Sequence, residues 1–281
     1  MIKEFAPAKV NLFLDILKKR TDGYHELGTV FQTIHIGDFL EGELIPNSSE
    51  IKIKYNTEQS FPLEKDLVYK TAKLLQEKFQ IKQGASFYLE KKMPLGAGLG
   101  GGSADAAAAF RILNKLWNLN LSQETLETLS AAIGADVPFL IQGGTAFATG
   151  IGEKLERVSL NLPPYLLVAT PECFVPTVEA YKNVIPSGFE NFENFKKSWT
   201  GNFDFKLFNK FEESVLEKFP LIAEMKQRMF ECGATHALMS GSGASVFAIY
   251  ETEESMHKAA KEIKPISRFL SETTFLKGSI L

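Results

Sequence analysis

The chain has 281 residues, of which 44% are hydrophobic and 23% charged, and its formal net charge at pH 7 is −3. These values are typical of a globular protein with one large or two ordinary domains, and they argue against a general nucleic-acid or membrane-surface binder. The two cysteines and four histidines have no zinc-ligand spacing, and no signal pattern or membrane-spanning run is evident, so we expect a cytoplasmic protein with reduced thiols.

Strand patterns dominate the first part of the chain. Residues 8–17 alternate polar and apolar side chains at their start, which predicts a strand with Lys9 and Asn11 on the same face. Taken alone, this pair is typical of a solvent-exposed face. The Asp22-Gly23 pair predicts a turn. Further strands are expected at residues 29–36, 39–45 and 51–55, with a second turn at residues 37–38.

Helical patterns follow. Ser103 and Ser122 stand where the N-caps of two helices are expected. The second of these helices is predicted to end at Gly134. Apolar spacing predicts helices at residues 66–79, 103–117 and 123–133, and a strand at residues 85–90.

The segment after these helices contains an acidic residue of interest. Asp136 follows the last helix and precedes Pro138, which favours extended backbone geometry before it. Taken alone, an aspartate at such a place is typical of a turn. Residues 143–153 predict a strand between glycine turns.

A proline pair divides the chain into two predicted domains. The sequence Leu162-Pro163-Pro164 is the best candidate for a boundary, which gives domains at residues 1–161 and 162–281. The second part mixes helices and strands, and this mixture indicates an α+β architecture. Strands are expected there at residues 165–169, 234–239, 246–250 and 268–275, and helices at residues 179–183, 209–218, 221–232 and 253–263.

One stretch carries most of the chemical information. Residues 94–104 have the sequence Pro-Leu-Gly-Ala-Gly-Leu-Gly-Gly-Gly-Ser-Ala, so five glycines fall within seven positions directly before a predicted helix. Glycine permits a positive φ and close approach of the backbone, and the N-terminus of a helix attracts anions. Together these features favour a phosphate site.

Three interpretations of this glycine loop compete. A flexible linker is rarely flanked by a strand and a strong helix. Residues 96–101 match the Gly-x-Gly-x-x-Gly fingerprint of dinucleotide-binding folds, but a second helix follows where that fold needs a strand. A nucleoside triphosphate site of another type fits best. It is not a Walker A loop, because no Gly-Lys-Ser/Thr follows, so the cation for the phosphates must come from elsewhere.

Three motifs together resemble the GHMP kinase superfamily, over essentially the full length of the chain. They are Pro7-Ala8-Lys9-Val10-Asn11-Leu12, the loop of residues 94–104, and the turn Ser240-Gly241-Ser242-Gly243. Asp22-Gly23-Tyr24-His25 and residues 134–139 resemble, more narrowly, the kinases that phosphorylate 4-diphosphocytidyl-2-C-methyl-D-erythritol in the non-mevalonate isoprenoid pathway. The resemblance implies a two-domain GHMP kinase fold of the α+β class. Its N-terminal domain would resemble the second domain of a small-subunit ribosomal protein, its C-terminal domain would be ferredoxin-like, and the active site would lie between them.

The resemblance also implies a reaction. ATP, with Mg²⁺, would phosphorylate the 2-hydroxyl of the cytidylyl substrate, with Asp136 as general base and Lys9 polarising the same hydroxyl. Ser103 is the side chain expected near Mg²⁺, and no acidic ligand like that of some other GHMP kinases is evident. The ATP phosphates would lie on the loop formed by Pro94, Leu95, Gly96, Ala97, Gly98, Leu99, Gly100, Gly101, Gly102, Ser103 and Ala104.

The substrate pocket is implied in the same way. Tyr24 and Tyr181 would stack on the cytosine ring, and His25 would form a hydrogen bond with that base. Two residues depart from the family pattern, because Asp66 stands near the adenine pocket where Asn is frequent, and Tyr181 stands where some relatives carry Phe. The rest of the pocket would be lined by Asn11, Phe31, Thr177, Gly241, Ser242 and Gly243.

Two other functions stay open at this point. A GHMP kinase for another small alcohol, such as mevalonate or homoserine, is disfavoured by the Asp-Gly-Tyr-His segment. A silent sugar- or nucleotide-binding regulator on the same fold should have lost Lys9 or Asp136, and both are present. Binding of a cytidine nucleotide separates these functions from the first. The expected partners are ATP and a small-molecule alcohol, and neither a nucleic acid nor a membrane is expected.

Overall fold

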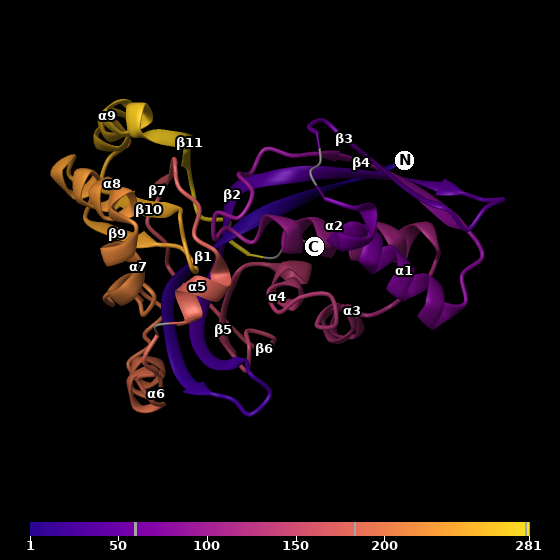
Figure 1. The fold of residues 1–281 in the computed structure, drawn as a ribbon, viewed down its shortest axis with the longest axis horizontal. Helices are drawn as coiled ribbons and strands as arrows, with labels where there is room; N and C mark the ends of the chain where they lie inside the picture. The colour runs from indigo at the N-terminus through magenta and orange to yellow at the C-terminus, as the bar shows by residue number, and fades with distance from the viewer. Residues whose placement is uncertain (59–60, 183, 279, 281) are drawn as a thin grey trace.

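Two sheets, each covered by helices, organise the molecule. The computed structural model describes residues 1–58, 61–182, 184–278 and 280. Within these residues the strands form a seven-stranded sheet and a four-stranded sheet, which lie in different parts of the molecule (Figure 1). The expected α+β class is therefore confirmed. No described helix is both long and apolar enough to cross a membrane, and the cytoplasmic location stays a prediction.

The larger sheet is built on a long antiparallel pair of strands. β1 (Ile2–Lys19) pairs with β2 (His25–Ile45) along nearly its whole length. The order across the sheet is β3-β4-β2-β1-β8, and β5 pairs with β2 and with β6. The other members are β3 (Ile51–Tyr55), β4 (Gly84–Glu90), β5 (Thr145–Thr149), β6 (Lys154–Val158) and β8 (Phe208–Asn209).

The prediction of a turn at residues 37–38 is wrong, because β2 continues through these residues without interruption. Gly37 pairs with Pro7 and Asp38 pairs with Ala6 across the β1–β2 ladder. A Gly-Asp pair is typical of an exposed turn, but Asp38 is fully buried here. Its charge has partners that sequence patterns cannot reveal, and they are described with the site below.

The helices of this part pack between the sheet and solvent (Figure 1). Two expectations are corrected by the helix starts. α2 begins at Gly101 after Gly100, whose φ is +73°, so Ser103 lies inside the helix and does not cap it. Pro138 is not preceded by extended backbone, because it occupies the first turn of a helix, where its missing N–H is not needed. The elements are η1 (Leu63–Lys65), α1 (Leu67–Phe79), α2 (Gly101–Leu116), α3 (Gln123–Ser130) and α4 (Val137–Gln142).

The smaller sheet has the order β11-β7-β10-β9, and every neighbouring pair in it is antiparallel. All four of its strands were expected within a few residues. They are β7 (Tyr165–Pro171), β9 (His236–Met239), β10 (Val246–Tyr250) and β11 (Ser267–Thr273), and the helices of this part are α5 (Thr177–Lys182), α6 (Glu190–Lys197), α7 (Glu212–Lys218), α8 (Pro220–Glu231), α9 (Glu253–Ile263) and η2 (Lys264–Ile266).

Several boundaries differ from the sequence predictions. α3 ends at Ser130, three residues before the predicted end. α7 begins at Glu212, because residues 208–209 form β8. β6 and α6 were not predicted, and the predicted helix end at Asn183 lies outside the described residues.

One later segment packs on the larger sheet. Phe192 of α6 is fully buried against Phe13 of β1, and Phe208 of β8 pairs with the same residue. Segments that follow β7 of the smaller sheet in the chain therefore return to pack on the larger sheet. The domain boundary between residues 161 and 162 stays a prediction.

Candidate active site

A cavity of about 400 Å³ lies where the two sheets meet. The middle of β1, the glycine loop before α2, the N-terminus of α4 and the turn between β9 and β10 all contribute to its wall. Among the lining residues are Lys9, Asn11, Phe31, Gly96, Gly98, Gly100, Ser103, Asp136, Phe174, Thr177, Tyr181, Phe211, Gly241, Ser242 and Gly243.

Lys9 and Asp136 face each other in this cavity. Lys9 Nζ lies 3.7 Å from Asp136 Oδ2, although the residues are far apart in the sequence. The lysine side chain is 5% exposed and the aspartate side chain is 30% exposed, so solvent and ligands reach the pair from the carboxylate side. Lys9 Nζ also lies 5.4 Å from the centre of the Phe31 ring. The pair combines a fixed buried cation with an accessible base.

A chain of buried hydrogen bonds fixes the lysine. Lys9 Nζ donates to Asn11 Oδ1 (2.9 Å), and Asn11 Nδ2 donates to Thr29 Oγ1 (2.8 Å). The Thr29 hydroxyl in turn donates to the Phe13 carbonyl oxygen (2.6 Å). Lys9 can only donate, so the Asn11 atom that faces it must be Oδ1. The Asn11 Nδ2 group is then left to donate to Thr29, and the Asn11 amide has a single orientation. Lys9 and Asn11 are both buried, so the solvent-exposed face considered for them is excluded.

The glycine loop differs in how its N–H groups and its carbonyl oxygens are paired. Within the described residues, no N–H of residues 96–103 donates a hydrogen bond to another residue. The carbonyl oxygens of Ala97 and Leu99 accept from the N–H groups of Ser245 and Lys9. Gly96, Gly98 and Gly100 have φ of +61°, +78° and +73°, which glycine adopts without strain. Free N–H groups at a helix N-terminus are the donors that a phosphate needs.

The turn between β9 and β10 supports this loop from behind. Ser240 Oγ donates to the Gly98 carbonyl oxygen (2.9 Å), and a Cβ on Gly98 would overlap the Ser240 carbonyl oxygen. Asn209 Nδ2 donates to the carbonyl oxygens of Met239 (2.7 Å) and Gly241 (2.8 Å). The close approach of the two segments therefore depends on the absence of a side chain at Gly98.

Aromatic side chains form the opposite wall. The Tyr181 ring stacks on the His25 ring with centroids 5.1 Å apart and meets the Phe211 ring edge-on at 4.7 Å. Burial, with a smaller contribution from the Asp136 charge, raises the pKa of Tyr181, and burial with the Lys19 charge lowers the pKa of His25. Both groups are therefore neutral at pH 7. Tyr24 is 61% exposed and is not among the residues that line the cavity.

A buried ionic cluster holds the start of the glycine loop. Lys91 forms ion pairs with Asp38 and, at 2.7 Å, with Asp105 in the first turns of α2. Asp38 also accepts from the N–H groups of Lys92 (2.5 Å) and Met93 (2.9 Å). Burial, with the nearby Asp38 charge, raises the pKa of Asp105 to about 8 even though Lys91 opposes the shift. Sequence analysis missed this cluster because only tertiary packing brings β2, the loop and α2 together.

Asp66 lies beside this cluster and has a structural role. It is the N-cap of α1, and its Oδ1 accepts from the N–H groups of Val68 (2.7 Å) and Tyr69 (3.2 Å). Its Oδ2 accepts from the Tyr55 hydroxyl (2.9 Å). Aspartate is a preferred N-cap, as asparagine is. Its presence there is therefore compatible with the same local fold.

A divalent cation would have few protein ligands here. Among the described residues, no three Asp, Glu, His or Cys side chains are grouped so that they could hold a metal ion. Ser103 and Asp136 are oxygen-bearing side chains that line the cavity. Mg²⁺ in kinases is commonly held by one or two side chains together with phosphate oxygens and water, so this sparse donor set fits a nucleotide-bound Mg²⁺.

Most of the predicted site residues come together at the cavity. Lys9, Asn11, Phe31 and Asp136 line it, as do Thr177, Tyr181 and the turn of residues 241–243.

Other predicted site residues do not line the cavity. The side chains of Ala97 and Leu99 are buried in the core, so they position the loop and cannot contact a ligand. Leu95 is 58% exposed outside the lining, and His25 reaches the cavity only through its stacking on Tyr181. Phe211 and Phe174 line the cavity without having been predicted.

Comparisons with known proteins identify relatives of this chain. The family model described as GHMP kinases N terminal domain matches residues 66–144, and the model described as GHMP kinases C terminal matches residues 189–265. A protein of Bacillus subtilis (strain 168) named 4-diphosphocytidyl-2-C-methyl-D-erythritol kinase is 38% identical over 265 residues, which are 92% of this chain and 91% of that protein.

Two further relatives carry the same description. A protein of Exiguobacterium sibiricum with the same name is 41% identical over 262 residues, with 88% of each chain covered. A crystal structure of 4-(cytidine 5'-diphospho)-2C-methyl-D-erythritol kinase superimposes with a TM-score of 0.81 at 33% identity, and the match covers 99% of this chain and 100% of that chain.

Proposed function

The chain belongs to the GHMP kinase superfamily and within it to the 4-diphosphocytidyl-2-C-methyl-D-erythritol kinases, and from this membership we propose that it phosphorylates the 2-hydroxyl of that substrate. The expected two-domain GHMP kinase fold is confirmed, and the protein is an ATP-dependent small-molecule kinase. The proposed product is an intermediate of the non-mevalonate isoprenoid pathway.

A single observation supports the proposed mechanism most directly. The Lys9–Asp136 pair, with its 3.7 Å separation, lines the same cavity as a loop whose N–H groups have no acceptor among the described residues. Phosphoryl transfer needs positioned phosphates and a group that takes the proton of the acceptor hydroxyl. Both requirements meet in one cavity here, and the accessible carboxylate faces the space between them.

In the proposed reaction, Asp136 Oδ2 accepts the proton of the substrate hydroxyl while the hydroxyl oxygen attacks the γ-phosphorus of ATP. The bond from that phosphorus to the bridging oxygen of ADP breaks as the new bond forms. Lys9, held by Asn11, polarises the same hydroxyl and keeps a positive charge beside the transferred group. The glycine loop holds the phosphates in line, and such positioning supplies a large part of the rate.

Mg²⁺ is the proposed metal cofactor. Ser103 would contribute the protein oxygen, beside phosphate oxygens and water. When bound, the ion neutralises charge on the triphosphate. For the substrate, we propose that Tyr181 and His25 receive the cytosine ring, because a neutral stacked pair suits an aromatic base. The stacking contact of the exposed Tyr24 stays a prediction.

An acceptor panel tests the proposal. The chain is incubated with ATP and Mg²⁺ and with the cytidylyl methylerythritol, mevalonate or homoserine, and phosphorylated product is quantified. Turnover confined to the cytidylyl compound is expected. Turnover of another acceptor alone would keep the fold and replace the substrate, and absent turnover in folded, ATP-binding protein would favour the regulator.

Matched variants test the two roles in the same assay. Asp136→Asn and Lys9→Ala are each expected to lower kcat by a factor on the order of 10² to 10⁴, the usual contribution of a positioned acid or base. Lys3→Ala is the control, because Lys3 lies on the same strand in an exposed ion pair with Glu41. Full activity in Asp136→Asn would exclude the carboxylate as base.

A further inference from the structure

The helix that carries Asp136 is too short to be rigid by itself. α4 has six residues, Val137–Gln142, and Asp136 is its N-cap. Its internal hydrogen bonds include Leu140 N–H to the Asp136 carbonyl oxygen (3.3 Å) and Gly143 N–H to the Phe139 carbonyl oxygen (2.8 Å). Helices of this length are unstable without outside contacts. The position of Asp136 therefore depends on what holds the other end of α4.

The carbonyl groups at that end are all satisfied by other segments. The last four carbonyl oxygens of a helix have no partner within the continuing helix, and buried ones need donors from elsewhere. The Leu140 and Ile141 carbonyls accept from Arg111 Nη1 at 3.0 and 3.3 Å. The Gln142 carbonyl accepts from the N–H of Ile280 (2.7 Å). Arg157 donates to the carbonyl of the C-cap residue Gly143 (2.5 Å) and, at 3.5 Å, to that of Phe139 within the helix.

Two guanidinium groups thus hold the carbonyl end of the helix. Arg111 belongs to α2, is 1% exposed, and is oriented by Glu4 (2.9 Å) and the Phe5 carbonyl oxygen (2.8 Å). Arg157 belongs to β6 and is oriented by Glu127 of α3 (2.8 Å). Positive charge at the C-terminal end of a helix is favourable, and a planar fork of donors suits several carbonyls at once.

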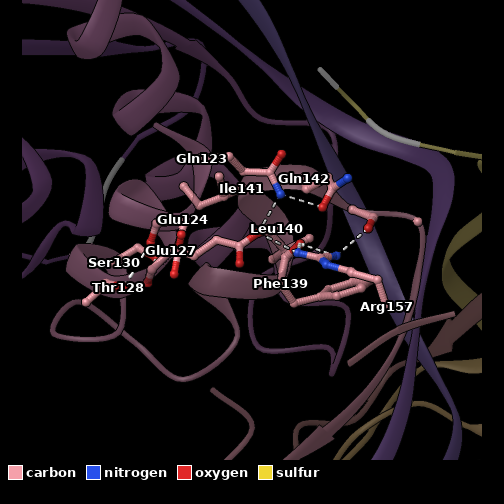
Figure 2. Close-up of polar contacts among 12 residues, drawn as sticks. Gln123, Glu124, Glu127, Thr128, Ser130, Phe139, Leu140, Ile141, Gln142 and Arg157 are labelled. Carbon is pink, nitrogen blue, oxygen red and sulfur yellow. Dashed lines mark hydrogen bonds and ion pairs between the residues drawn. The ribbon is translucent and has the colours of Figure 1, made fainter. Parts of the chain in front are cut away.

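Figure 2 shows the Arg157 side of this arrangement. The Arg157 side chain reaches toward the carbonyl end of α4, and Glu127 approaches its guanidinium group from α3. Gln123 Nε2 donates to Glu127 Oε1 (3.0 Å) and to Gln142 Oε1 (2.5 Å), which closes the network onto α4 itself. Glu127 and Gln123 of α3 therefore hold the Arg157 guanidinium group in the position from which it contacts the carbonyl end of α4.

A second path leads from Arg157 to Lys9. The guanidinium carbon lies 5.4 Å from the centre of the Phe139 ring, and the Phe139 and Phe31 ring centroids are 5.0 Å apart. Lys9 Nζ lies 5.4 Å from the centre of the Phe31 ring. Arg157 is thus connected to Lys9 through the Phe139 and Phe31 rings, and to Asp136 through α4.

We propose that Arg157 is a positioning residue for phosphoryl transfer, which fixes the Asp136 carboxylate against Lys9 by holding the carbonyl end of α4. Arg111 holds two other carbonyls of the same end. This inference rests on the proposed role of Asp136 as general base. A displacement of about 1 Å at a reacting group can cost a factor on the order of 10² in rate, so a contact this remote can matter.

Arg157 is the residue to vary, because Arg111 lies on the helix that follows the glycine loop and its loss would also disturb nucleotide binding. Arg157→Gln is expected to lower kcat by about ten- to a hundredfold and to leave KM for ATP within about twofold. Arg157→Lys keeps a cation with fewer fixed donors, so we expect it to recover part of the lost kcat. Glu156→Gln is the control, because Glu156 lies on the same strand in an exposed ion pair with Lys196.

A double-mutant cycle separates positioning from general stability. If Arg157 acts through Asp136, Arg157→Gln should change kcat by less than about twofold in the Asp136→Asn background. An undiminished effect in that background, or unchanged kcat in folded Arg157→Gln, would overturn the inference. If Arg157→Gln does not fold, Glu127→Gln and Arg157→Lys are measured in the same cycle and must give the same dependence on Asp136.

The two proposals can fail separately. Full activity in Asp136→Asn would refute the proposed base. An inactive Asp136→Asn together with fully active Arg157 variants would leave that base in place and refute only the positioning role.

Discussion

Two glycine-rich segments meet at the cavity, and they use glycine for different physical reasons. In the loop of residues 94–102, the N–H groups from residue 96 onward have no hydrogen-bond acceptor among the described residues. In the turn of residues 240–245, the N–H groups of Gly243 and Ser240 donate within the turn, to the carbonyl oxygens of Ser240 (3.0 Å) and Ser245 (2.9 Å). The first segment leaves these N–H groups without a protein acceptor, whereas the second uses two of its N–H groups to close its own turn.

The anchors of the two segments differ as well. The loop begins at Lys91–Met93, which buried carboxylates hold, whereas the amide of Asn209 holds the turn. One anchor is ionic and titratable, and the other is neutral. Two segments with similar glycine content therefore should respond differently to substitution and to pH.

The largest effect is expected where the two segments touch. Gly98→Ala should abolish activity and lower the melting temperature strongly, because the new Cβ would overlap the Ser240 backbone carbonyl. A positive φ costs an alanine only about 1–2 kcal/mol, so most of the damage would come from the clash. Activity and thermal unfolding are measured together.

Gly96→Ala is the matched control for this variant. It has a similar positive φ, but its Cβ would meet the side chain of Phe174, which is 60% exposed and can move. We expect a clearly smaller loss. Equal losses in the two variants would mean that backbone strain, and not the contact between the segments, explains both.

A smaller effect is expected from the neutral anchor of the turn. Asn209→Ala should cost about 1–3 kcal/mol for each buried carbonyl it leaves unpaired, at Met239 and Gly241. Denaturant unfolding measures this loss. Because the anchor carries no charge, the loss should be the same across pH, and a strong dependence on pH would contradict the distinction between the two anchors.

The ionic anchor should give the opposite result. Burial raises the pKa of Asp105 from 3.8 to about 8, so the folded state binds this proton more tightly than the unfolded state. Its contribution therefore falls as pH rises through that interval. Asp105→Asn should remove part of the decline in melting temperature between about pH 5 and pH 8. Asp22→Asn, at an exposed position, should leave the slope unchanged, and an unaltered slope in Asp105→Asn would refute the assignment.

The smallest effect is expected at the helical end of the loop. Gly102 lies in α2 with open space around it, since the nearest atom to a new Cβ is Leu67 Cδ1 at 3.7 Å. Gly102→Ala should raise the free energy of unfolding by up to about 1 kcal/mol through helix propensity. Measured beside Gly98→Ala, it shows which glycines in one loop are required. A large loss here would show that this N–H region tolerates no added methyl group.

Local patterns predicted elements well where the local signal and the tertiary environment agree. β10 and α9 have the predicted bounds because their apolar periodicity matches the faces they bury. The α4 segment was misjudged because Pro138 is compatible with the first turn of a helix as well as with extended backbone. The single strand β2 was predicted as two strands, because a Gly-Asp pair is typical of an exposed turn and the sequence does not reveal the partners that bury Asp38.

The site was predicted in part for a different reason. Lys9 and Asp136 were brought together by a family resemblance, and no spacing rule relates residues on a strand and a helix so far apart in sequence. The charged residues that hold the site in place were indicated neither by the family resemblance nor by a spacing rule. Asp38, Arg111 and Arg157 are ordinary charged residues in the sequence, and only the fold shows that each satisfies backbone groups of the site.

The packing of α6 and β8 on the larger sheet bears on how this chain reaches its native state. Phe192 and Phe208 reach β1 only after β7 of the smaller sheet has been synthesised. The hydrophobic core of the larger sheet therefore cannot close during translation until residue 208 has been synthesised, which is before β10 and β11, the partners of β7, leave the ribosome. Proteins with such long-range contacts fold slowly compared with those that complete one unit before the next. We expect the two sheets to unfold in a single transition, because Leu166 and Phe247 of the smaller sheet belong to the same hydrophobic core as Phe13 of the larger sheet.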